Sequence, residues 1–413
     1  RTFACARQSG ETEKPMGTDI FSGGIRVHLR LDGESVSHAG IESGRALGLT
    51  RWFKGKPWRQ ALDTLPLVFS ICSVAQRLAA VTAVERAAAI GPHPHRQSLR
   101  ELVLDAETAR EHLFRLFTDW SAVLGRQPEP KALSSVGRLV PEVLASMGAD
   151  SGLFLPGTAT GAPDAARLEA ALNRLDSLLR EQVLGVDPGN WYRMSTVEEF
   201  RRWLDGSEGL AAQFLRLLDD RHWAEVPIPP CEPLPLLDDD FLTAALAGDE
   251  SATFVSRPTV HGRVCETGAY VRERHHPLVR AVTAHRGTGI LMRLVARFLE
   301  LAALPTRMRQ RLVELGGLEP ATEVRVSGIT GVGIGQAEAA RGRLVHRVVL
   351  QDEHVVDYQI VAPTEWNFHP RGVLQQALTG LRRSDDLSTL VPLMVTTIDP
   401  CVAFELDIEE GAG

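Results

Sequence analysis

Residues 338–371 read EAARGRLVHRVVLQDEHVVDYQIVAPTEWNFHPR, and this stretch says most about the fold. Residues 343–350 and 355–361 are rich in Val, Leu and Ile and return to a period of two, which is typical of β-strands. The polar residues between them, 351–354, predict a turn that pairs the two strands. The stretch therefore predicts a β-hairpin in the C-terminal region.

A second hairpin is predicted near the other end of the chain. Residues 24–42, GIRVHLRLDGESVSHAGIE, alternate around Asp32-Gly33, a dipeptide that tolerates the positive φ of a tight turn. Between the hairpins, at about 73–316, apolar residues recur every three or four positions and predict a mainly helical middle. The expected helices are 73–89, 100–124, 164–184, 196–219 and 276–314 with a break near Pro305, while 126–163 is expected to be loop-rich and 226–238 a proline-dense connection.

The region from about 320 to 413 is expected to begin with a strand at 323–327, followed by a loop. That loop carries a cluster of glycines, Gly328, Gly331, Gly333 and Gly335, which lacks the GxGxxG order of a nucleotide site. The whole pattern predicts an α+β protein in which 1–18 is a mobile tail and 19–413 is a single domain. The two ends of this domain are expected to meet, which would bring Cys72 towards Cys401.

Composition excludes several classes of protein. The chain has 413 residues, of which 44% are hydrophobic and 23% charged, as in ordinary globular proteins. A net charge of -7 predicts no nucleic-acid partner. No apolar run approaches the roughly 18–20 residues that span a bilayer, and the polar N-terminus lacks a signal core. A cytoplasmic protein without a membrane partner is expected.

The five cysteines, Cys5, Cys72, Cys231, Cys265 and Cys401, are far apart and odd in number. This spacing predicts neither a disulfide framework nor a structural zinc site. A buried cysteine that acts as a small hydrophobe is the ordinary interpretation of each one. Cys72, however, directly precedes a predicted helix, whose N-terminus would stabilise a thiolate and lower the pKa of the thiol.

The first cysteine motif resembles that of nickel–iron hydrogenase large subunits. Residues 69–76, FSICSVAQ, are similar to the CxxCxxxH motif of that family, in which some regulatory members have Gln at the last position. On this register Cys72 is the second cysteine, Phe69 replaces the first, and Gln76 takes the His position. A shift of three residues would instead make Cys72 the first cysteine and Ala75 the lost second one.

Three further motifs follow in the family's order. Residues 399–407, DPCVAFELD, resemble DPCxxCxxH, so that Cys401 is the first cysteine, Phe404 replaces the second and Asp407 replaces the His. Residues 338–346 resemble EAPRGxLxH, and 362–371 resemble PTxWNxxPR. The likeness covers roughly 20–410. The loss of two cysteines is a feature of the HupK/HoxV-type maturation proteins, which are relatives of the large subunit.

The resemblance implies a ligand set. In the family the paired cysteines hold nickel and an iron with two cyanides and one carbon monoxide; the second cysteine of each pair bridges the metals. This chain would keep one bridging position, Cys72, and one nickel-only position, Cys401, so no complete nickel site is expected. Soft thiolates do suit such an iron. Arg341 and Thr364 match the family's cyanide-holding positions, and Thr364 follows Pro363 as in the family motif. Both side chains would donate hydrogen bonds to the cyanide nitrogens.

The ordinary alternative for Arg341 is a surface ion pair, and residues 111–115 are expected to form an ordinary helix with a solvated face. Replacements at family positions argue against turnover of hydrogen: Ser22 takes the place of the proton-relaying glutamate, and Thr50 and Asp407 replace two ligands of another metal. The sequence also ends about six residues after Asp407, so the family's cleavable C-terminal peptide is expected to be absent. No catalytic residue is therefore expected.

The function that the resemblance implies is a maturation scaffold carrying an Fe(CN)2(CO) unit transiently. It also implies three partners, namely the hydrogenase large-subunit precursor, a HypC-type chaperone and a HypD-type iron–sulfur protein. A metal-free interaction subunit is the first alternative, and an active or sensory hydrogenase the second.

Overall fold

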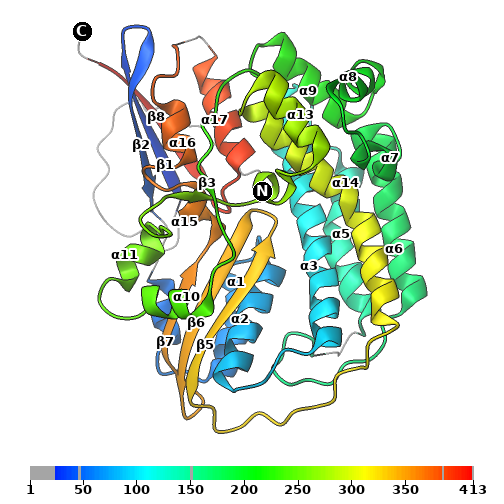
Figure 1. Cartoon of the computed structure of the whole chain (residues 1–413), viewed down its shortest axis with the longest axis vertical. Helices are drawn as coiled ribbons and strands as arrows, with labels where there is room; N and C mark the ends of the chain where they lie inside the picture. The colour runs from blue at the N-terminus through cyan, green and yellow to red at the C-terminus, as the bar shows by residue number, and fades with distance from the viewer. Residues whose placement is uncertain (1–23, 45–47, 149–151, 384–385, 412–413) are drawn as a thin grey trace.

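The computed structural model describes residues 24–44, 48–148, 152–383 and 386–411 (Figure 1). The predicted tail at 1–18 and Ser22 lie outside these residues. Among the described residues, no helix combines the length and the apolar character needed to cross a membrane.

The two ends of the chain share one sheet, as predicted. β1 (Ile25–Asp32) and β2 (Ser35–Ser43) form an antiparallel hairpin whose turn contains Gly33 at φ +59°. β8 (Phe404–Glu410) pairs in parallel with β1, which gives the order β2-β1-β8 (Figure 1). β8 was not predicted, although Phe404, Leu406 and Ile408 alternate with acidic residues.

A second sheet contains the predicted C-terminal hairpin. Its strands are β5 (Gly331–Ala339), β6 (Gly342–Gln351) and β7 (His354–Val361), antiparallel in the order β5-β6-β7. The prediction of a strand at 323–327 followed by a glycine loop was wrong. Residues 323–327 form no strand, and the glycines from Gly331 onward belong to β5.

The glycines of β5 allow helix α2 (Ser73–Ala87) to lie directly on the sheet. A Cβ atom added to Gly333 would lie 1.9 Å from the carbonyl oxygen of Ala83, and one added to Gly335 would lie 1.9 Å from that of Ala79. Glycine at every second position is thus a strand signal in which one face of the strand has no side chains. This contact sets the position of α2, which begins next to Cys72.

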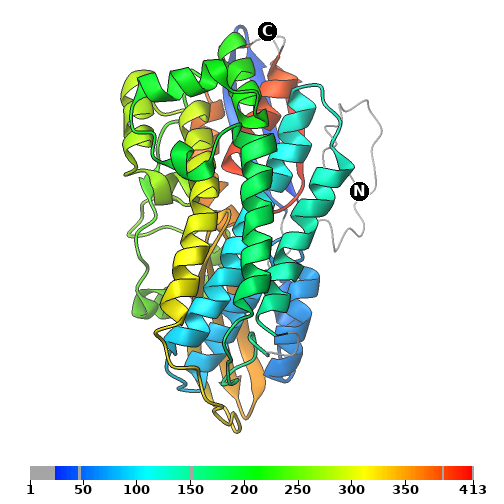
Figure 2. The same ribbon diagram turned by 90° about the vertical axis from the view of Figure 1, so that its right-hand side faces the viewer.

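The helical middle is a layer of long helices that run side by side (Figure 2). Helix α5 occupies part of the stretch that was predicted to be loop-rich, and the 196–219 helix is two helices. The break in 276–314 falls at 287–289, not at Pro305, which lies inside α14. The long helices are α3 (Pro94–Arg115), α5 (Pro130–Ser146), α6 (Ala165–Leu178), α8 (Val197–Gly206), α9 (Leu210–Asp220), α13 (Pro277–Arg286) and α14 (Ile290–Leu315).

Further elements connect the sheets and the helical layer. Two π-helical turns continue α3 and α6. The remaining elements are a 3-10 helix, η1 (Leu49–Phe53), the π-turns η2 (Leu116–Trp120) and η3 (Leu179–Leu184), the helices α1 (Trp58–Val68), α4 (Ser121–Val123), α7 (Pro188–Tyr192), α10 (Asp239–Ala245), α11 (Ser251–Ser256), α12 (Ala269–Glu273), α15 (Pro363–Asn367), α16 (Val373–Leu378) and α17 (Leu387–Ile398), and the strands β3 (Glu232–Pro233) and β4 (Cys265–Glu266).

Candidate functional site

Cys72 is the residue that caps the N-terminus of α2, as the sequence predicts. Its thiol is half-buried. The side-chain nitrogen of Gln76, Nε2, lies one turn further along α2 and donates a hydrogen bond to Cys72 Sγ at 3.8 Å. The side chain of Gln76 is fully buried, and no described residue donates to its Oε1. The structure therefore brings these two candidate residues together.

The N-terminus of α2 also binds a carboxylate that sequence analysis missed. Glu107 of α3 accepts hydrogen bonds from the backbone amides of Val74, at 2.8 Å, and Ala75, at 2.9 Å. Burial raises the pKa of Glu107 to about 7, against the lowering effects of Arg110 and the two amides. The N-terminus of α2, the positive end of the helix dipole, thus binds the carboxylate of Glu107 and also lies next to Cys72.

Cys401 lies beside Thr364. Its sulfur is 2.8 Å from Thr364 Oγ1, and the Cys401 amide donates to the same oxygen at 3.4 Å. Both residues are buried, and Pro363 occupies the first turn of α15 and so places Thr364. These three candidates therefore belong to one site.

Arg341 lies at the turn between β5 and β6 and is buried, so the surface ion pair considered for it is wrong. Its Nη1 donates to Glu111 at 2.8 Å and its Nε donates to Asp399 at 3.1 Å. Burial works to lower the pKa of the guanidinium, but the charges of Asp399, Glu111 and Cys401 outweigh it and raise that pKa. Arg341 is therefore a fixed cation next to Cys401.

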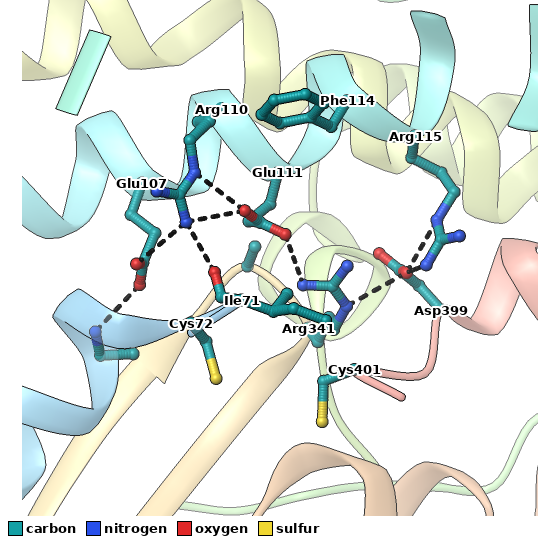
Figure 3. A network of polar contacts seen from close by, with 12 residues as sticks. Ile71, Cys72, Glu107, Arg110, Glu111, Phe114, Arg115, Arg341, Asp399 and Cys401 are labelled. Carbon is teal, nitrogen blue, oxygen red and sulfur yellow. Dashed lines mark hydrogen bonds and ion pairs between the residues drawn. The ribbon is translucent and has the colours of Figure 1, made fainter. Parts of the chain in front are cut away.

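A continuous chain of polar contacts joins the two cysteine motifs (Figure 3). Arg110 donates to the carbonyl oxygen of Ile71 at 2.6 Å and to Glu111 at 2.9 Å. Glu111 in turn accepts a hydrogen bond from Arg341, and Arg341 donates a second one to Asp399. In Figure 3 both thiol groups point away from α3, which supplies the arginine and carboxylate side chains at the top of the view.

The carboxylate of Asp399 is surrounded by three arginines. Arg115 Nε donates to it at 3.0 Å, Arg297 Nη1 lies 3.4 Å from Oδ2, and Arg341 binds as described. Burial alone would raise the pKa of Asp399, but the arginines hold it well below its usual range. The predicted solvated face at 111–115 is wrong, because Glu111 and its neighbour His112 are buried.

The positions at which the family has further ligands are occupied differently here. Phe69 and Phe404 are half-buried and pack against the hydrophobic core. Asp407 Oδ2 lies 3.2 Å from His28 Nδ1, and Thr50 lies in η1. Across the described ranges, no group of three or more His, Cys, Asp or Glu side chains is arranged to hold a metal ion.

Cys231 and Cys265 lie elsewhere. Both are buried, at the paired strands β3 and β4, and burial raises the pKa of Cys231 to about 11. They have the character of small hydrophobic residues rather than of ligands.

The fold is similar to that of nickel-dependent hydrogenase large subunits. A family model described as nickel-dependent hydrogenase matches residues 266–405. The Ni-Fe-Se hydrogenase from Desulfovibrio vulgaris Hildenborough has a similar fold, with a TM-score of 0.65 and 17% identity, over 90% of this chain and 94% of its own.

Closer relatives identify the branch of that class. The hydrogenase expression/formation protein HupK of Bradyrhizobium diazoefficiens is 30% identical over 94% of this chain and 98% of its own length. HoxV of Cupriavidus necator, also a hydrogenase expression/formation protein, is 28% identical over 91% of this chain and 94% of its own. The chain belongs to the HupK/HoxV family of hydrogenase expression/formation proteins.

Proposed function

We propose that this protein is a maturation scaffold that binds an Fe(CN)2(CO) unit transiently and passes it to the hydrogenase large-subunit precursor. A role in hydrogenase maturation follows from the names of its relatives. One observation supports the carrier in particular. Thr364 and Arg341 lie beside Cys401. Ion pairs from Arg341 to Glu111 and from Glu111 to Arg110, followed by a hydrogen bond from Arg110 to the Ile71 carbonyl, connect this group to the segment of Cys72.

The chemistry of the side chains suits this cargo. Thiolates are good ligands for a low-spin iron with carbonyl and cyanide groups. We assign Cys72 as the main ligand and Cys401 as a second one. Of the two bridging sulfurs that bind the iron in the family, this chain keeps only Cys72. The iron would therefore be weakly held and could be released, and no hydrogen turnover is proposed.

The second coordination shell has donors for the cyanides. Arg341 uses Nε and Nη1 in its ion pairs, and no hydrogen bond from its Nη2 is found in the described part of the chain. This nitrogen and the hydroxyl of Thr364 are the proposed donors to cyanide nitrogen. Gln76 would support Cys72 from one turn along α2, and Pro363 would keep Thr364 in place.

The proposed partners are the large-subunit precursor, a HypC-type chaperone and a HypD-type iron–sulfur protein. A deletion strain complemented with variants tests the role. We expect Cys72→Ser with Cys401→Ser to abolish hydrogen-dependent dye reduction by the served hydrogenase. Cys231→Ala, outside the site, should support normal maturation. Full maturation with the double variant would mean a metal-free interaction subunit instead.

A further inference from the structure

A pocket of about 350 Å³ lies between α3, α14 and the β5–β6 hairpin, and no residue of either cysteine motif lines it. Four arginines do: Arg272, Arg307, Arg311 and Arg343. The exposed fractions of their side chains lie between 13% and 35%, so each is reachable from solvent. The pocket is thus lined by cations from three different elements.

The carboxylates on the α3 side of the pocket are already fully engaged. Asp105 accepts through Oδ1 from Arg307, at 2.6 Å, and through Oδ2 from Arg311, at 3.0 Å. Glu101 accepts through Oε1 from Gln97 and through Oε2 from Arg311. Every oxygen of these two side chains has a donor.

The carboxylates on the opposite side are engaged in the same way. Glu300 accepts from Arg272 through both oxygens and contacts His112 as well. Glu338 accepts from Arg272 and from Arg343. Each of the four carboxylates of the pocket is therefore paired with an arginine of this protein.

Three of the arginines, in contrast, have N–H groups for which no hydrogen-bond acceptor is found among the described residues. Arg307 Nε is buried without a hydrogen-bond partner among the described residues. Within the same part of the chain, no hydrogen bond is found from Arg307 Nη1, Arg311 Nη2 or Arg343 Nη2. A pocket with paired carboxylates and spare guanidinium donors is complementary to a ligand that only accepts hydrogen bonds.

We propose that this pocket binds a small molecule that carries a phosphate or carboxylate group. Guanidinium groups match the geometry of both oxyanions and stay protonated. The proposal stands apart from the iron-carrier function, since it uses neither thiol. Arg272 also donates to the carbonyl oxygen of Ala340 at 2.9 Å, so the pocket adjoins the turn that carries Arg341.

Calorimetric titration of the metal-free full chain tests this site. The probes are inorganic phosphate, pyrophosphate and citrate at constant ionic strength, with chloride as the blank. We expect one saturable site for at least one probe. Tighter binding of pyrophosphate would assign a phosphorylated ligand, and tighter binding of citrate a carboxylic one. No saturable binding of any probe would overturn the proposal.

Variants of α14 place the binding in the pocket. Arg311→Gln should weaken binding at least tenfold. Arg311→Lys keeps the positive charge but lacks the planar guanidinium with its paired donors, and it should weaken binding less. Arg309→Gln is the matched control, since Arg309 pairs with Glu169 and Asp176 on another side of the same helix. Equal weakening by the Arg309 and Arg311 variants would show non-specific attraction and contradict the site. If Arg311→Gln fails to fold, Arg311→Lys decides alone.

Discussion

The guanidinium of Arg341 donates through Nε to the carboxylate of Asp399 at 3.1 Å, and both side chains are buried. Asp399 stands two residues before Cys401, and Arg341 is fixed from its other end by Glu111. The pair therefore joins the β5–β6 turn to the C-terminal motif. Because loss of Arg341 would remove part of the positive charge that compensates these two buried carboxylates, the pair holds its surroundings in one arrangement.

Replacing Arg341 should destabilise the whole protein. Arg341→Met removes the arginine that Glu111 and Asp399 share, while Arg110 still contacts Glu111 and Arg115 still contacts Asp399. We expect the free energy of unfolding to fall by about 1.5–3 kcal/mol, the contribution of hydrogen bonds to charged groups. Urea denaturation measures this. Arg383→Met is the control, because Arg383 pairs with Glu410 at an exposed position and should cost less than about 1 kcal/mol. Equal losses from the two variants would refute the buried bridge.

The stability of the protein should depend on pH through Glu107. Its pKa is raised from 4.5 to about 7, so between these values the folded state binds more protons than the unfolded state. The free energy of unfolding should therefore fall as pH rises from 4.5 to 7, by about 3 kcal/mol from this group. Glu107→Gln should flatten the profile in that window. An unchanged slope in the variant would show that another group causes it.

Close packing of α2 on β5 should make Gly335 intolerant of any side chain. A Cβ atom there would lie 1.9 Å from the carbonyl oxygen of Ala79, so Gly335→Ala must displace α2 or β5. We expect a loss of about 1–3 kcal/mol or more in stability. Gly137→Ala, in α5 with no atom near the added Cβ, should be neutral or stabilising by up to about 1 kcal/mol. Thermal unfolding of the two variants compares them.

The helices and strands whose apolar residues recur at a regular spacing could be predicted from the sequence. Both hairpins and the start of α2 follow from local alternation or local helical spacing, and each has the predicted place in the structure. The family resemblance named Cys401 and Thr364 as candidate site residues, but the direct contact between them was not predicted. Helix α5 was missed because Pro130 and Pro141 resemble helix breakers, although one begins the helix.

The charged surroundings of the site could not be predicted. Arg115 and Asp399 are 284 positions apart, and their contact depends on how α3 passes the end of α17. Glu107 likewise caps a helix that it does not belong to. Charged residues on a helix with an apolar stripe are usually solvated, and only the tertiary arrangement shows that these are buried.

The hydroxyl of Thr364 should influence a bound cyanide if the iron unit is carried here. Thr364→Val keeps the shape of the side chain but removes the donor that lies 2.8 Å from Cys401 Sγ. We expect a shifted cyanide band in the infrared spectrum of the loaded protein, with Thr364→Ser restoring the original position. Identical spectra for all three proteins would remove Thr364 from the proposed site.

The most direct test is the infrared spectrum of the protein purified without oxygen from cells that also express the maturation machinery. Cyanide and carbonyl stretches lie where proteins are almost transparent. We predict two cyanide bands and one carbonyl band, lost in Cys72→Ser and retained in Cys231→Ala. A blank spectrum, recorded beside a partner chaperone that shows the bands, would contradict the carrier and leave a metal-free interaction protein.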